Sequence, residues 1–332
     1  MSRRGLSLAA AVALTAACLW WALHNVEFSE LGRVLVLVRW QWLIPIILIV
    51  GLLDISIRAW RWRILLSRAV AAPLGDMFRF SAIGMAVNNL LFARLGELLR
   101  AVLAARALKI PVATTLASIV VERTLDLATL LTLFVAAASM LPGLVPAGLR
   151  HTGIFALIAV VAGLLFLILA ERTMEPGGWV ERSLRLWPKL HEIVEHLALG
   201  AAVLRRPRAF FPVLGLSLGL WVVDAAVFWL GAFALGLEGI IDYPRSILVL
   251  AWAGAASSIP AAPGSIGTFE AVVKSILIDM GATVHEAFAY ALFIHILTYL
   301  LVTGIGLVFL YREGLSLGGL RESLEKGKDS LL

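Results

Sequence analysis

The chain has 332 residues, of which 61% are hydrophobic and 15% are charged, with a mean hydropathy of +0.95 and a formal net charge of +6. Soluble domains average about 45–50% apolar and about 25% charged residues, so this composition excludes an ordinary soluble protein and predicts an all-α polytopic membrane protein. A single cysteine, Cys18, excludes a disulfide framework and a cysteine-based metal site. The modest basic excess fits loops beside anionic lipid headgroups and predicts no nucleic-acid partner.

Six apolar runs are long enough to cross a bilayer as helices, which takes about 20 residues. They lie at 5–24, 41–66, 112–140, 152–170, 210–237 and 285–311. The first run follows Arg3 and Arg4 but is long for a signal peptide and lacks a clear cleavage site, so we expect a retained helix.

Two further apolar stretches, 76–108 and 245–280, are interrupted near their middles by glycine, and the second also by Pro260 and Pro263. Broken helices are tolerated at membrane depth where they are buried in protein or line a cavity, so we expect two re-entrant hairpins. The run FARLGE can be aligned with PGSIGT so that Gly96 falls on Gly267. Because the hairpins are expected to start from opposite sides, this similarity predicts an inverted repeat whose halves meet near the midplane.

Lys and Arg residues concentrate in 171–209 and 312–332, which places both termini in the cytoplasm. We therefore expect one integral membrane domain, 1–332, in a bacterial inner membrane. Its parts are a first half at 5–170, an amphipathic cytoplasmic connector at 171–209, a second half at 210–311 and a cytoplasmic tail at 312–332. Arg33 and Arg39 fall on the outer side and count against this orientation.

The second apolar run contains Asp54 and Arg58, spaced i,i+4, a pair that can partly neutralise itself in lipid. Arg61 and Arg63 follow, and their position near the end of the run indicates cytoplasmic anchors.

The third run contains Glu122, Arg123 and Asp126, with the two carboxylates on one helical face. These carboxylates need a cationic partner, for which Arg94 and Arg100 are the candidates. Alternatively, one of them carries a proton.

The first broken stretch combines Arg94 at the break with Glu97 and Arg100 one turn apart, preceded by Asn88 and Asn89. A loop that leads into a helix exposes backbone N–H groups and a positive dipole end, so with Arg94 it predicts a cradle for a phosphate or carboxylate. The alternative is a self-satisfied polar network that pins the hairpin.

The second broken stretch places Ser265 and Gly267 before a helix start and then Glu270 and Lys274, which we expect to pair at i,i+4. Asp224 and His295 are single polar residues in the last two apolar runs, and we expect His295 to be a hydrogen-bonded packing residue, as a lone histidine in a helix usually is.

The chain contains no G-x-x-x-x-G-K-[ST], H-E-x-x-H or G-x-S-x-G motif. We therefore expect no ATP hydrolysis, no catalytic residues, no metal site and no cofactor.

Taken together, the motifs resemble the membrane domain of the lysylphosphatidylglycerol synthase/flippase family over about residues 40–310. The similarity lies in three patterns, N-x-x-x-(G/A)-R-L-G-E-x-x-R, E-R-x-x-D and P-x-x-P-G-x-I-G-x-F-E. They are carried here by Asn89, Arg94, Leu95, Gly96, Glu97 and Arg100, by Glu122, Arg123 and Asp126, and by Pro260, Pro263, Gly264, Gly267, Phe269 and Glu270. Phe92 departs from the pattern, because the family more often has proline there.

The resemblance implies lipid translocation between leaflets, in which some relatives serve hopanoid or glycolipid pathways. No counterpart of the synthase's soluble aminoacyl-transferase domain is seen, so we expect no aminoacyl transfer.

The sequence thus predicts a flippase or transporter, not an enzyme, for a lipid with an anionic headgroup, which can be a phospholipid, an isoprenoid or hopanoid-type lipid, or a glycolipid. The expected substrate-binding residues are Asn88, Asn89, Arg94, Gly96, Glu97, Arg100, Arg58, Ser265, Gly267 and Glu270. The expected charge-balancing or proton-coupling residues are Asp54, Glu122, Arg123, Asp126, Lys274 and Asp224. Two alternatives are a membrane-embedded transferase or hydrolase acting on a lipid phosphate, and a non-transporting scaffold that holds lipid-biosynthesis enzymes together.

Overall fold

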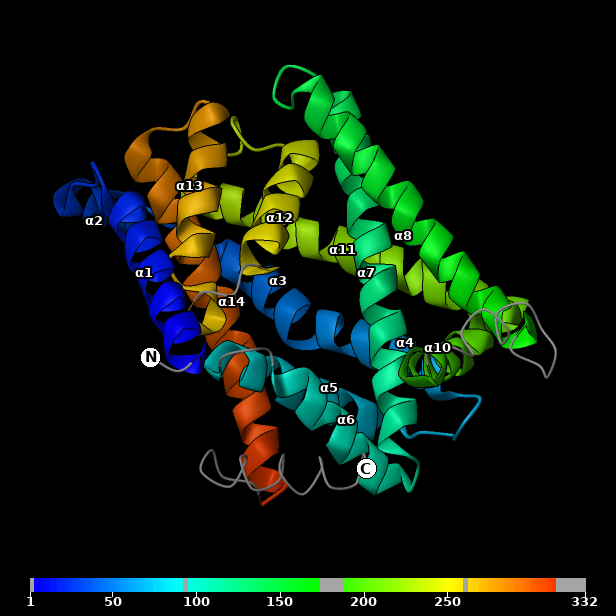
Figure 1. Ribbon diagram of the computed structural model, residues 1–332. Coiled ribbons are helices and arrows are strands. Elements are labelled where there is room, and N and C mark those ends of the chain that lie inside the picture. The colour runs from blue at the N-terminus through cyan, green and yellow to red at the C-terminus, as the bar shows by residue number, and fades with distance from the viewer. Residues whose placement is uncertain (1–2, 92–94, 174–187, 259–261, 315–332) are drawn as a thin grey trace.

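The computed structural model describes residues 3–91, 95–173, 188–258 and 262–314, and this part of the chain is helical without any strand (Figure 1). The first half comprises α1 (Arg3–Leu23), α2 (Phe28–Val36), η1 (Trp40–Trp42), α3 (Leu43–Leu48), η2 (Ile49–Asp54), α4 (Ile55–Leu66), α5 (Leu74–Leu90), α6 (Leu95–Leu108), α7 (Val112–Met140) and α8 (Ala147–Thr173). The connector region contains α10 (Pro188–Ala201) and η4 (Ala202–Arg205), and the second half comprises α11 (Pro207–Leu235), α12 (Tyr243–Ser258), η5 (Pro263–Ser265), α13 (Thr268–Asp279) and α14 (Val284–Arg312).

Four helical stretches within the described residues are long and apolar enough to cross a membrane. They are Trp40–Leu66, Ala147–Leu169, Pro207–Leu235 and Val284–Arg312. A shorter apolar helix covers Ala13–Leu23, and α7 has 29 residues but carries three charged side chains in its first half. All six expected runs are therefore helical, whereas the expectation of six full spans stays a prediction.

Each of the two broken stretches folds into two short helices that pack against one another, α5 with α6 and α12 with α13. These helices have 12 to 17 residues, hence about 18–25 Å at 1.5 Å per residue, which is less than the hydrocarbon thickness of about 30 Å. Phe92 and Pro260 lie outside the described residues. Helical hairpins are thus present, and their re-entrant placement and inverted-repeat relation stay predictions.

Small residues let the helices of the first half approach closely, as is common in membrane bundles. A Cβ atom added to Gly96 on α6 would strike the carbonyl oxygen of Gly84 on α5. On the other face of α5, a Cβ on Gly306 of α14 would strike the carbonyl of Ala82 and the Cβ of Ala86. Helix α5 is therefore held between α6 and α14 by contacts that leave no room for a larger side chain.

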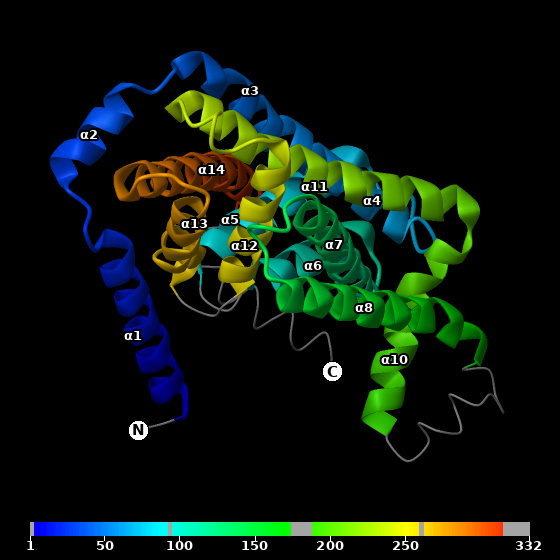
Figure 2. The ribbon, with the colours of Figure 1, turned by 90° about the horizontal axis from the view of Figure 1, so that it is seen from above.

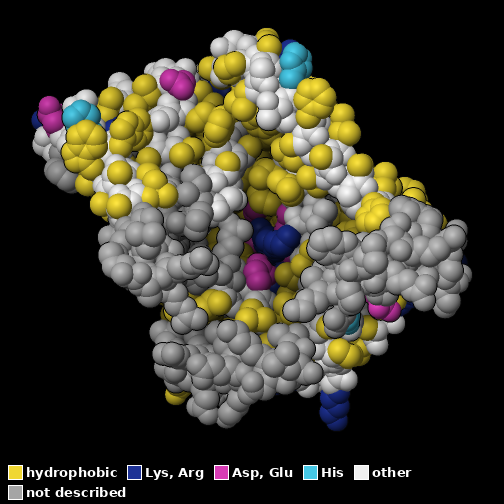
Figure 3. All heavy atoms as spheres, in the orientation of Figure 1, with side chains coloured by type: hydrophobic (Ala, Val, Ile, Leu, Met, Phe, Trp, Pro, Cys, Tyr) yellow, Lys and Arg dark blue, Asp and Glu magenta, His cyan; other side chains and the backbone are white. Residues whose placement is uncertain are grey.

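The two sides of the molecule differ in their helices. Figure 1 places α1, α13 and α14 on one side and α7, α8 and α10 on the other, and Figure 2 shows α3, α4 and α11 forming the layer behind them. The expected connector contains α10, whose Gly200 packs tightly on Ala117 of α7. Much of the face in Figure 3 is covered by hydrophobic side chains, as expected for a surface in lipid.

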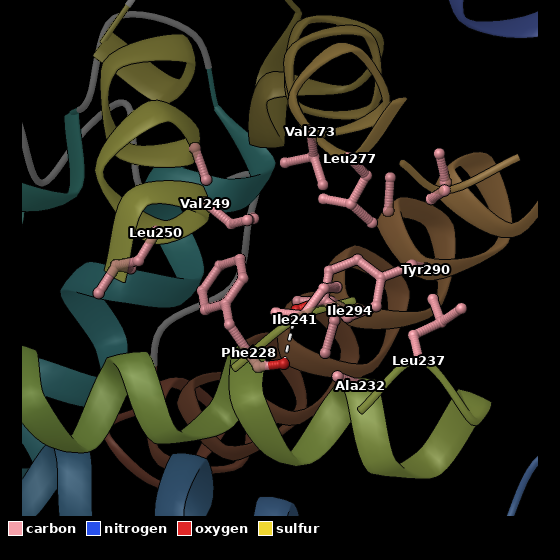
Figure 4. Packing of buried hydrophobic residues seen from close by; sticks show 14 of the residues in the cluster. Phe228, Ala232, Leu237, Ile241, Val249, Leu250, Val273, Leu277, Tyr290 and Ile294 are labelled. Atoms are coloured by element: carbon pink, nitrogen blue, oxygen red, sulfur yellow. Dashed lines mark hydrogen bonds between the residues drawn. The ribbon is translucent and has the colours of Figure 1, made fainter. Parts of the chain in front are cut away.

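The second half has its own apolar core between α11, α12, α13 and α14 (Figure 4). Tyr290 of α14 is fully buried there, and its hydroxyl donates to the carbonyl of Phe228 at 2.6 Å. Gly231 on α11 faces Ile294 on α14 so closely that a Cβ would strike that side chain. This core fixes the positions of α13 and α14, which carry the second polar site.

Candidate functional site

A cluster of ionisable side chains lies between η2–α4, α6, α7 and α11, and we call it the charge network. Its members are Arg58, Arg61, Arg100, Arg123, Asp54, Glu97, Glu122, Asp126 and Asp224. Five of the nine have relative exposures of 5% or less, so most of these charges have been removed from water. Mutual pairing makes this burial tolerable, because buried charges are costly unless they are paired and hydrogen-bonded.

Arg61 of α4 stands at the centre of the charge network with a fully buried side chain. Its Nη1 lies 2.6 Å from Asp126 and donates to Ser217 of α11 at 3.1 Å, while Nη2 lies 3.3 Å from Glu122. The expectation that Arg61 is a cytoplasmic anchor is therefore wrong. A signal for the correct assignment was present, since residues 54, 58 and 61 are spaced i, i+4 and i+7 and so share one helical face.

Glu122 of α7 forms ion pairs with three guanidinium groups. Arg100 of α6 approaches it at 3.1 Å, Arg61 at 3.3 Å, and Arg123 donates a short hydrogen bond to it. Arg100 also lies 4.8 Å from the ring of Trp62, a cation–π contact that adds to its stabilisation. Of the two cations expected to partner Glu122, Arg100 does so, and Arg94 lies outside the described residues.

Arg58 bridges two carboxylates. Its Nε lies 2.9 and 3.0 Å from the two oxygens of Asp54, and its Nη2 lies 3.2 Å from Asp224 of α11. Asp54 ends η2, a π-helical segment that widens the helix immediately before α4, and such bulges are frequent at functional sites. The predicted i,i+4 pair is present, and Asp224 is not a single polar residue but a third member of the group.

The charge network reaches the surface at Arg123 and Glu97. The side chain of Arg123 is 40% exposed and that of Glu97 26%, and their nearest charged atoms are 3.9 Å apart. Figure 3 shows a hollow in the molecular face in which basic and acidic side chains gather, bordered by hydrophobic ones. A charged group from outside can therefore approach Arg123 without first penetrating the apolar core.

Asn88 and Asn89, at the end of α5, form hydrogen bonds to α6 and to α14. The Asn88 side chain accepts a hydrogen bond from the Gly96 N–H at 2.8 Å. This N–H was predicted to help bind an anion at the start of α6, and in the structure it binds Asn88 instead. Asn88 also donates to Glu97 at 3.4 Å. Asn89 donates to Thr303 of α14 at 3.0 Å.

The second polar site surrounds the turn before α13. Glu270 accepts the Gly267 N–H at 2.7 Å with Oε2, and its Oε1 lies 2.6 Å from Nδ1 of His295 on α14. His295 Nε2 lies 2.8 Å from the carbonyl oxygen of Gly264. His295 is hydrogen-bonded, as expected, and through these bonds it connects Glu270 with the turn. Ser265, half-buried in this turn, accepts the Thr268 hydroxyl hydrogen bond with its carbonyl.

Lys274 does not pair with Glu270 as expected. Its Nζ donates to the carbonyls of Ala22 at 3.0 Å and His24 at 2.8 Å, at the C-terminal end of α1. A cation is stabilised there by the unpaired carbonyls and by the negative end of the helix dipole. Lys274 thus holds α1 against α13 and lies apart from both polar sites.

The two hairpins meet at their turns. The Gly264 position is so close to α5 and α14 that a Cβ there would strike the ring of Tyr299 and lie 3.3 Å from the carbonyl oxygen of Asn89. Because Gly264 has a φ of +65°, glycine suits it conformationally as well as sterically. Most predicted site residues therefore fall into two adjoining groups, the charge network with Asn88, Asn89 and Gly96, and the turn with Ser265, Gly267 and Glu270.

These features define a multi-pass helical membrane protein with a buried polar interior between apolar outer faces. The chain matches the family described as Lysylphosphatidylglycerol synthase TM region over residues 8–306, and it belongs to that family. It is also similar to a UPF0104 membrane protein of Methanothermobacter thermautotrophicus, with 22% identity over 303 residues that cover 85% of this chain and 86% of the relative. No solved structure matches the chain. Family membership indicates a membrane-lipid-related function.

Proposed function

We propose that this protein moves a lipid with an anionic headgroup across the bacterial inner membrane, as a flippase or transporter and not as an enzyme. The carried lipid is a phospholipid, an isoprenoid or hopanoid-type lipid, or a glycolipid. The observation that supports this most directly is the charge network, which opens to the surface at Arg123 and Glu97 in a molecule whose outer helices are apolar. A polar path inside an apolar wall suits a headgroup that crosses while its tails stay in the bilayer.

A purely structural role explains the charge network poorly. Each ionisable group costs about 2.5–3.5 kcal/mol at the centre of a membrane helix on insertion scales. Replacing buried ion pairs with apolar side chains of similar size is often neutral or stabilising, so packing alone gives no reason for nine such groups in one cluster. Ionisable groups inside membrane proteins are usually retained for a ligand or ion that passes them.

The balance of charge suggests how an anion would bind. Among the residues that the structure describes, the charge network contains four arginines and five carboxylates, so each of these guanidinium groups already has a carboxylate partner. An anionic headgroup must therefore replace a carboxylate, and Glu97 is the most exposed one, bound to Arg100 at 2.7 Å. In the proposed cycle the headgroup displaces Glu97 from Arg100 and Arg123, and guanidinium groups suit this exchange because they bind phosphate and carboxylate in the same bidentate way.

The test is a translocation assay with purified protein in liposomes. Headgroup-labelled anionic phospholipid, zwitterionic phospholipid and isoprenoid phosphate are each followed as the label becomes accessible to a membrane-impermeant quencher. We expect protein-dependent movement of one anionic class, lost in Arg123→Gln and kept in Arg106→Gln, which removes an exposed arginine of α6.

Three results would contradict the proposal in different ways. No movement of any lipid by folded protein removes the transport function. Chemical conversion of a headgroup by the purified protein supports the transferase or hydrolase alternative. Normal lipid metabolism in cells whose protein lacks the charges of the network supports the scaffold alternative.

A further inference from the structure

The hydrogen bonds around His295 determine how many protons it shares with Glu270. The Gly264 carbonyl oxygen can only accept, so His295 Nε2, at 2.8 Å, must carry a hydrogen. A neutral imidazole then has an unprotonated Nδ1, which would face Glu270 Oε1 at 2.6 Å. Two lone pairs at this separation repel one another. One additional proton must therefore lie between Nδ1 and Oε1.

Both carboxylate oxygens of Glu270 already have a partner, so the carboxylate cannot avoid the additional proton by a simple rotation. Oε2 accepts the Gly267 N–H at 2.7 Å, so turning the carboxylate away from His295 breaks the hydrogen bond that begins α13. Turning or re-tautomerising the imidazole gives up its bond to the Gly264 carbonyl. The pair is buried, with side-chain exposures of 11% for His295 and 7% for Glu270.

We infer that the Glu270–His295 pair is a proton-binding site that closes the turn of the second hairpin when it holds its proton. With the proton, the pair is neutral overall and all three hydrogen bonds are made. When the proton leaves for water, a carboxylate and a neutral imidazole remain, and either the Gly264 or the Glu270 contact of His295 must break. The loss of one proton thus releases the turn from α14.

The released turn lies where the two hairpins meet. Gly264 packs against Tyr299 and the backbone of Asn89, and Asn88 beside it contacts Gly96 and Glu97 of the charge network. Protonation of the pair is therefore positioned to govern access to the charge network. Its use as the coupling proton of transport rests on the function proposed above, whereas the proton-binding site itself does not.

Other ionisable groups on the surrounding helices are bonded away from the pair. Lys274, one turn along α13, is bonded to carbonyls of α1, and Tyr299, one turn along α14, directs its hydroxyl to the Asn89 carbonyl. The ion pairs on α2, η2, α5, α11 and α12 include Glu30–Arg33, Asp54–Arg58, Asp76–Arg79, Arg79–Glu313, Asp224–Arg58 and, from just before α12, Asp242–Arg245. The described side chains of α1 carry no charge. Proton binding at this site therefore depends on Glu270 and His295 themselves.

Glu270→Gln separates proton binding from hydrogen bonding. The glutamine oxygen can accept the Gly267 N–H, and its amide can donate to Nδ1 of a neutral His295, which still donates to Gly264. Every bond is kept and the titrating proton is removed. Glu286→Gln is the matched control, because Glu286 forms the same kind of capping interaction with Thr283 at the start of α14 but is only partly buried and, among the described residues, forms no hydrogen bond to a histidine.

The first readout is amide hydrogen exchange of the full-length protein in micelles, compared between about pH 6 and about pH 9. Exchange in residues 262–272 is divided by exchange in residues 213–223 of α11, which contain neither substitution and no titratable side chain, so the chemical pH dependence cancels. In wild type and Glu286→Gln we expect this ratio to rise with pH, by at most about tenfold per pH unit for one proton. In Glu270→Gln we expect no change.

Each outcome of the exchange experiment decides the question. A ratio that does not change with pH in wild type overturns the proton-binding site. So does a pH-dependent ratio in Glu270→Gln, and so does a Glu270→Gln protein that fails to fold, since glutamine supplies every hydrogen bond.

The second readout is the liposome assay with an imposed proton gradient. We expect wild-type lipid movement to respond to the gradient and any movement by Glu270→Gln to be indifferent to it. If lipid movement by the wild-type protein does not respond to the gradient, the coupling of the proton to transport is refuted. The proton-binding site is then tested by the exchange experiment alone. Absence of lipid movement in all proteins refutes the proposed function instead.

Discussion

Removing the central guanidinium of the charge network by Arg61→Met is expected to destabilise the protein strongly. Methionine fills much of the same volume without charge, so the change isolates the loss of pairing. Arg61 is fully buried and contacts Asp126 at 2.6 Å and Glu122 at 3.3 Å. Its removal leaves two carboxylates with one fewer cation in an interior that water does not reach.

The size of the effect follows from what the carboxylates keep. Breaking a buried ion pair from one side typically costs about 3–5 kcal/mol. Asp126 retains Arg123 at 3.3 Å and the indole N–H of Trp221 at 3.3 Å, and Glu122 retains Arg100 at 3.1 Å. We therefore expect the lower end of this range, a loss of about 3 kcal/mol in the free energy of unfolding.

The measurement is reversible unfolding in mixed micelles of mild detergent and dodecyl sulfate, followed by tryptophan fluorescence. Arg63→Met is the control, because Arg63 is exposed on the same helix and its loss should change stability by no more than about 0.5 kcal/mol. Combining Arg61→Met with Asp126→Leu should cost less than the sum of the two single changes, because no unpaired charge is left at Asp126. A loss below about 1 kcal/mol, the level of an exposed pair, would refute the assignment of Arg61 to a buried network.

Two further predictions use the same unfolding assay. Gly96→Ala should destabilise the first hairpin by about 1–3 kcal/mol, because the added Cβ strikes the Gly84 carbonyl; Gly32→Ala, which has no atom within 4 Å of its Cβ, should cause no loss. The hydrogen bond from Arg39 lowers the pKa of Glu238 below its usual 4.5. This pair should therefore stabilise the fold fully above about pH 4.5 and stop doing so as the pH falls through the lowered pKa, an effect that Arg39→Gln abolishes. Both side chains are substantially exposed, so the contribution should stay under about 1 kcal/mol, and a larger one would contradict this reasoning.

The positions of the helices could be predicted from the sequence because the length of an apolar run depends on local composition. The run 112–140 coincides with α7, and the breaks in 76–108 and 245–280 coincide with the ends of short helices. Local ion pairs were also predictable where both partners lie on one helix face, as with Asp54 and Arg58. Helix α2 was not predicted, since it is short and mixes apolar with charged residues.

Partners from distant parts of the chain could not be predicted in this way. His295 binds a carboxylate 25 positions earlier, and Lys274 binds carbonyls some 250 positions earlier, so neither choice leaves a trace in local spacing. For Lys274 the predicted local partner, Glu270, was wrong, and for His295 no partner was predicted, because a buried side chain is oriented by the helix packed against it. The buried pairing of Arg61 was not predicted for a different reason. Its position near the end of the apolar run indicates an anchor, whereas its spacing from Asp54 indicates a shared helical face, and the second indication was the correct one.

The way the helices are bonded limits how this protein can change shape. Ion pairs that water cannot replace connect α4, α6, α7 and α11, so moving any of these apart would expose unbalanced charge at a cost of about 3–5 kcal/mol for each pair. The second hairpin is attached to α14 by the hydrogen bonds of a single histidine and by apolar contacts, which can be exchanged at lower cost. In the transport cycle proposed above, we therefore expect the four charged helices to move as one rigid unit. Probes attached to two of them would keep their separation, and a probe on α13 would shift relative to both.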